Sequence, residues 1–207
     1  MAELTADVRY TESRNRLTTA FRAILAIPHV IVMQVWGYLA EILAVIQWFI
    51  IVFTGTRNQG LWDLQRAWIG YAGRVVAYES LLFDEYPAFG TDQSNVPMVF
   101  ELEYEEPANR VTNGLRFIWI IPALIIGIGL GIAVFFVAVV SWFAILFTGR
   151  HPRGMWDFIL KVTRFTLQLN AYGLLLTDTY PKWGSGVPTP VGGGGSAPLP
   201  PPTPQTA

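Results

Sequence analysis

Two long apolar segments alternate along the chain with two shorter amphipathic ones. Residues 17–53 contain only Arg22, His29 and Glu41 as ionisable groups, and residues 111–147 contain only Arg116. About 20 apolar residues span a bilayer as a helix, whereas a segment of this length would form a helix of roughly 55 Å. The pattern therefore predicts two short crossings per segment, as a transmembrane hairpin at about 17–55 and another at about 111–149.

Glycine and proline refine the two predicted hairpins. Gly37 in the first segment, and Gly127, Gly129 and Gly131 in the second, mark the expected turns, because glycine adopts the backbone angles of a tight reversal. Pro28 and Pro122 lie at matched positions in the first helix of each hairpin, where a proline is expected to kink the helix. The alternative is one long, tilted or bent helix in each segment.

The amphipathic segments follow directly, at about 60–83 and 154–176. Asp63 and Arg66 in the first, and Asp157, Lys161 and Arg164 in the second, recur at helical spacing opposite apolar residues. We expect two helices that lie in the headgroup plane on the cytoplasmic side or pack on the hairpins. Trp62 and Trp156 suit the membrane interface. The alternative, in which each amphipathic segment is a third crossing of its half, is disfavoured by the charges that it would carry into the bilayer.

The whole pattern occurs twice. Residues 15–89 and 109–183 align without a gap at an offset of 94, with 27 of 75 positions identical, so the chain contains a tandem repeat. Alternating apolar residues at 4–10 and at 98–104 extend the repeats to about 4–89 and 98–183, with a linker at 90–97. Each extension predicts a short strand, and the two strands could pair on the cytoplasmic face. The acidic run that contains the second could equally be a solvated linker.

Some positions are kept in both halves, and we interpret them as structural. Gly55 and Gly149 are expected to cap the hairpins, and the repeated acids to cap helices or to pair with arginines. The kept positions are Pro28, Pro122, Gly55, Gly149, Trp62, Trp156, Asp63, Asp157, Asp84 and Asp178. Residues 184–207 are almost wholly Gly, Pro, Ser and Thr, and we expect a disordered tail.

Composition places the chain among membrane proteins. It is 52% hydrophobic and 14% charged, against about 25% charged in soluble domains. The fold class predicted is an all-α membrane protein of two tandem parallel repeats. No Lys or Arg lies in a predicted hairpin turn, so outward-facing turns would leave every basic residue, and both termini, in the cytoplasm. The N-terminus lacks the pattern of a cleavable signal peptide.

Candidate chemistry is sparse. The absence of cysteine excludes disulfides and thiol catalysis, two histidines are too few for a metal cluster, and a net charge of −1 gives no reason to expect nucleic acid. No cofactor or catalytic motif is recognised. The polar residues at membrane depth belong to the first half and are candidates for a partner contact or a proton or substrate role: His29, Gln34, Glu41 and Gln47. Arginines at the hairpin entrances are candidates for lipid phosphates or for topology alone: Arg14, Arg16, Arg22, Arg110 and Arg116.

Particular motifs resemble those of a known family. They are Asn15-Arg16-Leu17-Thr18, Ala26-Ile27-Pro28-His29 and the run from Trp142 through Gly149-Arg150-His151-Pro152-Arg153 to Trp156-Asp157. The chain is similar to the bacterial, largely actinobacterial, membrane proteins of domain-of-unknown-function family 4389, as a duplicated member. The first half departs from the pattern at residues 56–59, and the second lacks the Pro-His pair. The resemblance implies an integral inner-membrane protein and no particular activity.

These observations favour a non-enzymatic accessory or scaffold subunit of a larger envelope complex, in transport (including lipid transport) or respiration. Its expected partners are the lipid bilayer and other membrane-protein subunits. The alternative is a small transporter or channel built from the two hairpins. A membrane enzyme that acts on lipid headgroups would need the repeated aspartates and arginines to converge.

Overall fold

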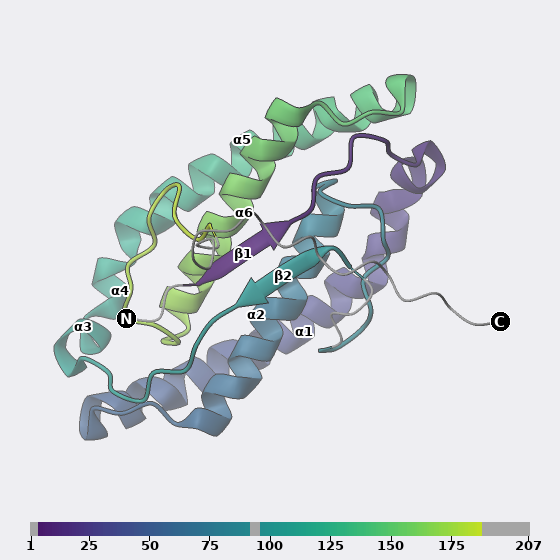
Figure 1. The fold of residues 1–207 in the computed structure, drawn as a ribbon. Helices are drawn as coiled ribbons and strands as arrows, with labels where there is room; N and C mark the ends of the chain where they lie inside the picture. The colour runs from purple at the N-terminus through teal and green to yellow at the C-terminus, as the bar shows by residue number, and fades with distance from the viewer. Residues whose placement is uncertain (1–3, 92–95, 188–207) are drawn as a thin grey trace, which may run out of the picture.

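The computed structural model describes residues 4–91 and 96–187. Its elements, in chain order, are β1 (Thr5–Val8), α1 (Arg16–Thr54), α2 (Gln59–Glu79), β2 (Met98–Glu101), α3 (Arg110–Gly114), α4 (Arg116–Trp119), α5 (Ile121–Thr148) and α6 (Arg153–Gly173). Each repeat thus has a strand, a long helical stretch and a shorter helix, in that order (Figure 1).

The predicted hairpins are wrong, because each long apolar segment runs without a reversal. α1 is one helix of 39 residues that passes through both Pro28 and Gly37, and the glycines predicted to turn the second hairpin lie inside α5. Gly37 serves packing instead: a Cβ built there would meet the Trp68 ring of α2 at 3.3 Å. A Cβ at Gly127 would meet a Leu169 methyl of α6 at 2.8 Å. The alternative of one long, tilted or bent helix per segment agrees with the structure: α1 is continuous, and the second segment runs without reversal as α3, α4 and α5, with breaks at Leu115 and Ile120.

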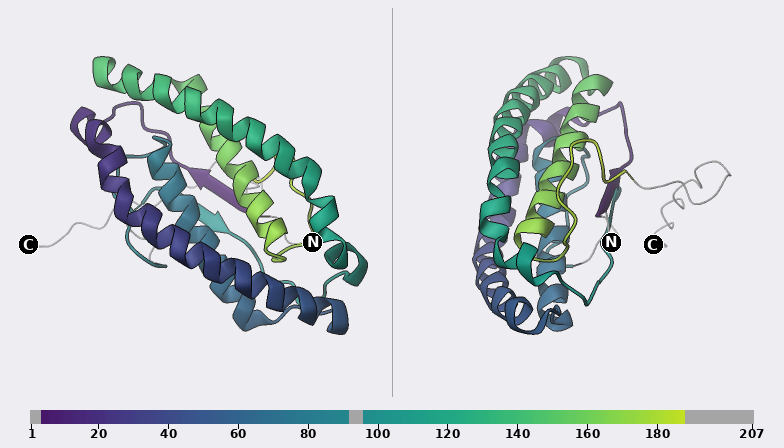
Figure 2. Two further views of the ribbon diagram at one scale, coloured as in Figure 1. Left: turned by 180° about the vertical axis from the view of Figure 1, so that it is seen from behind. Right: turned by 90° about the vertical axis from the view of Figure 1, so that its left-hand side faces the viewer.

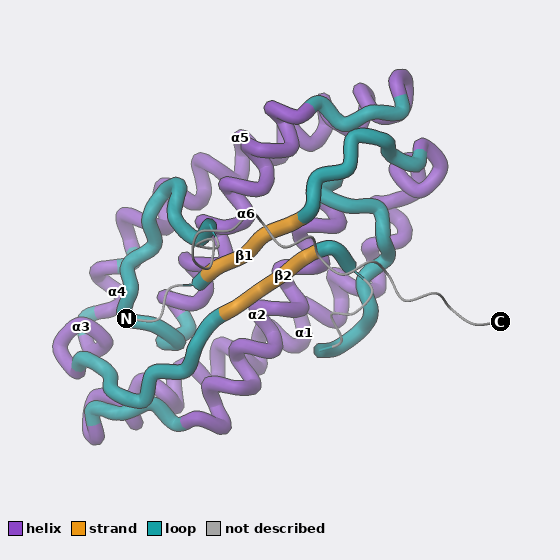
Figure 3. Tube along the Cα trace, in the orientation of Figure 1, coloured by secondary structure: helices purple, strands orange, loops and turns teal. Residues whose placement is uncertain are grey.

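The helices and strands form three layers. The right-hand view of Figure 2 shows α1 and α5 in one outer layer, α2 and α6 in the middle, and the two strands on the far side. Figure 3 shows the strands as the short orange segments beside the middle of the molecule. The amphipathic helices therefore pack on the long helices, as one of the two predicted placements had it. Trp62 and Trp156 were expected at the membrane interface, but they are buried in the core.

The prediction of parallel repeats is wrong, because the two repeats are related by an approximate twofold axis. β1 and β2 pair in antiparallel fashion, and Ala6 lies opposite Phe100, its own counterpart at the 94-residue offset. An antiparallel pair of equivalent strands with this register has its centre on a twofold axis. The long helices obey the same symmetry, since α1 and the α3–α5 stretch run in opposite directions (Figure 1).

Bonds between equivalent residues join the repeats reciprocally. The indole of Trp48 donates to the Asn113 carbonyl oxygen at 3.0 Å, and that of Trp142 donates to Thr19 at 2.9 Å. A second pair of indoles, those of Trp62 and Trp156, donates across to the chain just after α6 and α2, at the carbonyls of Leu176 and Leu82. Both halves keep these tryptophans because each indole donates to a backbone carbonyl of the other repeat.

The predicted strands are confirmed, and their inner face is core. Leu4, Ala6 and Val8 of the first repeat are buried with Met98 and Phe100 of the second. The alternation of apolar residues places one face of each strand on α2 and α6 and leaves the charged face outward. The predicted tail begins in contact with this sheet, since the Ala6 amide donates to the Gly186 carbonyl at 3.1 Å. Positions 92–95 of the predicted linker and 188–207 of the tail lie outside the described residues.

Two helical stretches are long and apolar enough to cross a membrane by length and composition, Arg16–Thr54 and Arg116–Thr148. Their apolar side chains are largely exposed. Leu17, Val35 and Phe53 are 68%, 66% and 74% exposed. These positions lie 18 residues apart, which is five full turns, so they share one face along the whole of α1. The face opposite, with residues such as Ala26, Ala40 and Ile51, is buried.

Candidate functional site

An arginine–aspartate cluster closes the end of the molecule where α1 begins and α2 ends. The Arg22 guanidinium donates to the carbonyls of Tyr78 and Phe83 and to the Asp84 carboxylate, the last at 2.5 Å. The Asn15 amide, at the start of α1, donates to the other Asp84 oxygen at 2.8 Å. Asp84 therefore ties the first turns of α1 to the chain that leaves α2.

The second repeat builds the equivalent cluster around Asp178. Arg116 donates to the carbonyls of Tyr172 and Thr177 and, at 2.8 Å, to the Asp178 carboxylate. The Asn109 amide and the Asn113 side chain donate to the same carboxylate at 2.9 and 2.8 Å. Burial opposes ionisation of Asp178, but these donors and the arginines hold its pKa below the ordinary range. Asp178 is therefore a carboxylate that the fold keeps charged.

Each cluster takes a second arginine from a different place. Arg57, in the turn after α1, donates to Asp178 at 2.5 Å and to the Leu175 carbonyl at 2.8 Å. Its counterpart in the other repeat is His151, so Arg14 supplies the second guanidinium near Asp84, with 4.0 Å between Nη1 and Oδ1. Arg14 also donates to the Leu82 carbonyl at 2.7 Å.

His151 occupies, in the second repeat, the position that Arg57 has in the first, but it carries no charge. Its Nδ1 lies 3.1 Å from the Leu81 carbonyl oxygen and its Nε2 lies 3.2 Å from the Ser141 hydroxyl. Burial, together with the nearby Arg14 charge, lowers the pKa of His151 to about 4. The residue is therefore a neutral imidazole at physiological pH, and it anchors the turn after α5 to the end of α2.

Three of the five arginines proposed for lipid phosphates are not available for that role. Arg14, Arg22 and Arg116 are buried and bonded inside the clusters. Arg16 and Arg110 remain exposed at the ends of the molecule. Arg110 donates to the Thr54 carbonyl at 2.8 Å, which places it over the last turn of the other repeat's long helix.

The polar residues of the first apolar segment divide into buried and exposed ones. His29 is fully buried, with Nδ1 2.8 Å from the Tyr71 hydroxyl and its ring stacked on Phe89 at 4.1 Å. Gln47 is also buried, and it accepts from the Asn58 amide at 3.3 Å. Gln34 and Glu41 lie on the exposed surface of α1. The four do not form one site.

The residues kept in both halves act in the fold. Gly55 and Gly149 adopt φ of +78° and +73° and cap the long helices, as predicted. Pro28 lies inside α1, whereas Pro122 falls in the first turn of α5, where its missing N–H costs no hydrogen bond. Among the remaining repeated residues, Asp157 pairs with Arg153 on the surface at 2.9 Å, while Asp63 is exposed.

A cavity of about 520 Å³ lies between α1 and α5, near the Asp84 cluster. Its walls come from both long helices and its floor from the end of α2, with residues such as Ala23, Ala26, Glu79, Phe135 and Trp142. The equivalent positions in the other repeat are larger on one wall, with Phe117 for Ala23 and Ile120 for Ala26. At that end Ile120 packs against Gly173, since a Cβ built on the glycine would lie 3.1 Å from Ile120 Cδ1.

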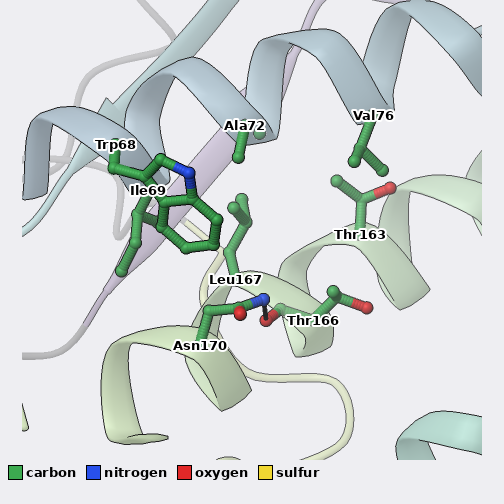
Figure 4. A pocket seen from close by; sticks show the side chains of 9 residues that line it. Trp68, Ile69, Ala72, Val76, Thr163, Thr166, Leu167 and Asn170 are labelled. Atoms are coloured by element: carbon green, nitrogen blue, oxygen red, sulfur yellow. Dashed lines mark hydrogen bonds between the residues drawn. The ribbon is translucent and has the colours of Figure 1, made fainter. Parts of the chain in front are cut away.

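A smaller cavity of about 30 Å³ lies between α2 and α6. Figure 4 shows Trp68, Ala72 and Val76 on one side and polar side chains from α6 on the other, including Asn170, which donates to the Thr166 carbonyl at 2.8 Å. Its volume suits about one or two water molecules.

Sequence reasoning missed Arg57, His151 and Glu79. A signal was present for all three, because each differs from its counterpart at the 94-residue offset. Arg57 aligns with His151, and Glu79 aligns with Gly173. The difference at residues 56–59 was recognised, but the sequence did not indicate that Arg57 and His151 would be bonded to other segments of the chain. Among the described residues, no group of acidic and histidine side chains could hold a metal ion.

The comparison with protein families agrees with the resemblance found in the sequence. The family model described as Domain of unknown function (DUF4389) matches residues 16–90 and again residues 110–184, which together make up more than half of the chain. The chain belongs to the DUF4389 family. It is a duplicated member, and each match covers a long helical stretch, the shorter helix after it and the aspartate that follows, Asp84 or Asp178. No curated protein and no solved structure matches it.

Proposed function

We propose that this protein is a non-enzymatic scaffold subunit that lies in the cytoplasmic leaflet of the bacterial inner membrane and supports a larger envelope complex. One observation carries the proposal. The exposed apolar surface follows the whole length of α1 and α5, while the charged face of the sheet lies on the opposite side of the molecule at their mid-length.

The length of the apolar surface favours helices that lie along the membrane. Leu17 and Phe53 are separated by about 54 Å of helix, against about 30 Å of hydrocarbon in a bilayer. A steep crossing would therefore leave apolar side chains of both ends in water. Embedding along the membrane plane covers all of them at once, as amphipathic membrane-surface helices do.

The position of the sheet also favours helices that lie along the membrane. A steep crossing of α1 would bring the middle of the sheet to the centre of the bilayer, with Asp7 and Glu101 on its exposed face. A charged side chain at that depth costs about 2.5–3.5 kcal/mol on insertion scales. In the embedded orientation both acids face water. No Lys or Arg lies between Arg22 and Arg57 or between Arg116 and Arg150, so the basic residues also stay on one side, which fits a cytoplasmic polar face.

The chemistry supports a scaffold over an enzyme. Asp84 and Asp178, the acids most enclosed by donors, are bonded to arginines and amides that hold the ends of the repeats together. His29, the main candidate for a proton role in a transporter, is enclosed by aromatic rings. The open polar face of the sheet is the surface left for other subunits.

The absence of cysteine makes a direct test possible. Single cysteines at Leu17, Val35 and Phe53, each carrying a spin label, report depth in reconstituted bilayers through collision with oxygen and a nickel chelate. We expect equal depth at the three positions, and a label at Val99 on the sheet to be in water. A crossing helix would instead give a deep Val35 and two shallow ends, and that result would overturn the orientation.

The scaffold role has its own test. A photocrosslinker at Val99 in growing cells is expected to form adducts with other proteins, whereas the same group at Val35 is expected to react with lipid. Adducts at Val99 that contain only lipid or water would contradict a scaffold that uses this face.

A further inference from the structure

The cavity between α1 and α5 opens among side chains that the proposed function places in the membrane. Phe135 and Phe143, which line it, are 63% and 49% exposed. At about 520 Å³ it falls in the range of small-molecule sites, which are mostly apolar with a few polar groups. The molecules able to reach it from this side are the lipids themselves.

Glu79 gives the cavity a charge of defined sign. It lies at the last position of α2 and lines the floor. Among the described residues it has no hydrogen-bond or ion-pair partner, and burial raises its pKa. The cationic residue of the described lining, Arg22, already donates to two carbonyls and to Asp84. A carboxylate in an apolar cavity calls for a cation that also donates hydrogen bonds.

The orientation of the molecule determines which part of a lipid meets Glu79. The floor belongs to the middle layer, on the side of the polar face, whereas the walls belong to the embedded helices (Figure 2). A lipid that enters between α1 and α5 therefore points its headgroup toward Glu79 and leaves its chains in the bilayer.

We propose that this cavity binds a membrane lipid whose headgroup ends in a primary ammonium group, with the Glu79 carboxylate as the group that accepts its hydrogen bonds. The inference rests on the proposed orientation. It also explains the difference between the repeats: the other end has Gly173 in place of Glu79, and Ile120 and Phe117 in place of the two alanines. Lipid recognition therefore belongs to the end that carries Glu79, whereas at the other end Ile120 occupies the space beside Gly173.

The test uses the full chain in a neutral detergent, with native mass spectrometry to count bound lipids. Phosphatidylethanolamine and phosphatidylcholine with identical chains are offered in equal amounts, because they share a positive charge and only the first has N–H donors. We expect a preference of about tenfold for phosphatidylethanolamine, equivalent to about 1.4 kcal/mol. Phosphatidylglycerol, offered in the same way, is expected to bind more weakly than either.

Three variants separate charge from space. Glu79→Gln should bring the ratio close to one, and Ala26→Ile, which installs the residue of the other repeat, should reduce binding of both lipids. The matched control Glu103→Gln removes an exposed acid on the sheet side and should keep the preference. Thermal unfolding of each variant verifies folding, and Glu79→Gln, which keeps the side-chain shape, decides the question if Ala26→Ile is unstable.

A ratio near one in the natural chain, or a preference that survives Glu79→Gln, would overturn the lipid site. The depth measurements report on the orientation separately. Equal depth along α1 with no lipid preference would remove the site and leave the scaffold orientation in place, whereas a deep Val35 would refute the orientation whatever lipid is bound.

Discussion

Substitution of Asp178 by asparagine tests whether the end clusters hold the repeats together. The variant keeps the shape of the side chain and removes its charge. Arg57 and Arg116, whose side chains are 0% and 4% exposed, then remain buried with no carboxylate between them.

The magnitude follows from that burial. Removal of one partner from a buried ion pair costs about 3–5 kcal/mol, because the remaining charge is left uncompensated. Asp178 itself is 19% exposed, and asparagine can still accept one of the hydrogen bonds, so we expect a loss of about 3 kcal/mol in the free energy of unfolding.

The assay is reversible denaturation in a mild detergent, followed by far-ultraviolet circular dichroism. The matched control is Asp157→Asn, which also removes an acid from an arginine pair, but one in which both side chains are more than half exposed. Such surface pairs contribute about 0–1 kcal/mol. Equal losses in the two variants would refute the view that the Asp178 cluster stabilises the fold through buried charge.

Two further predictions concern the turns after the long helices. His151 has a pKa of about 4 in the folded protein, below its ordinary 6.5, so the unfolded chain binds the proton more tightly. The contribution of neutral His151 to the free energy of unfolding should therefore be fully present above about pH 6.5. It should fall by up to about 3 kcal/mol as the pH drops to 4. His151→Gln should flatten this part of the profile in denaturation midpoints, and an unchanged slope would contradict the assignment. Gly55→Ala should lower the thermal midpoint, by about 1–2 kcal/mol in stability, because φ is +78° and the new Cβ would lie 2.8 Å from Arg110 Nε. Gly131→Ala, in open helix, should leave the midpoint unchanged or raise it, and a loss there as large as at Gly55 would argue against a conformational cause.

The strands and the shorter helices could be predicted from the sequence, but the way in which the layers are arranged could not. The period-two alternation at 4–10 and 98–104 predicted the strands, and the helical period predicted α2 and α6, because both patterns report burial of one face. The same alternation could not state that Ala6 would lie opposite Phe100. That register depends on how the two repeats pack against each other, which the alternation within one strand does not contain.

The prediction of hairpins was wrong because of how glycine was interpreted. Gly37 and Gly127 were interpreted as turn residues, yet both glycines permit a long helix to approach the shorter helix beneath it. Glycine in a sequence indicates either unusual backbone angles or close packing, and only the neighbour decides between them. Here the neighbours are Trp68 and Leu169, which lie in other helices.

The sequence by itself determined the two long apolar segments, the duplication and the residues that both halves keep, because hydrophobic periodicity and repeated motifs are local properties. The tertiary structure alone decided the twofold relation, the charge clusters and the cavity beside the Asp84 cluster. Arg14 and Arg57 occupy different positions of the repeat and still serve equivalent clusters. Such an exchange is invisible along the chain, because it depends on distances between segments that only folding brings together.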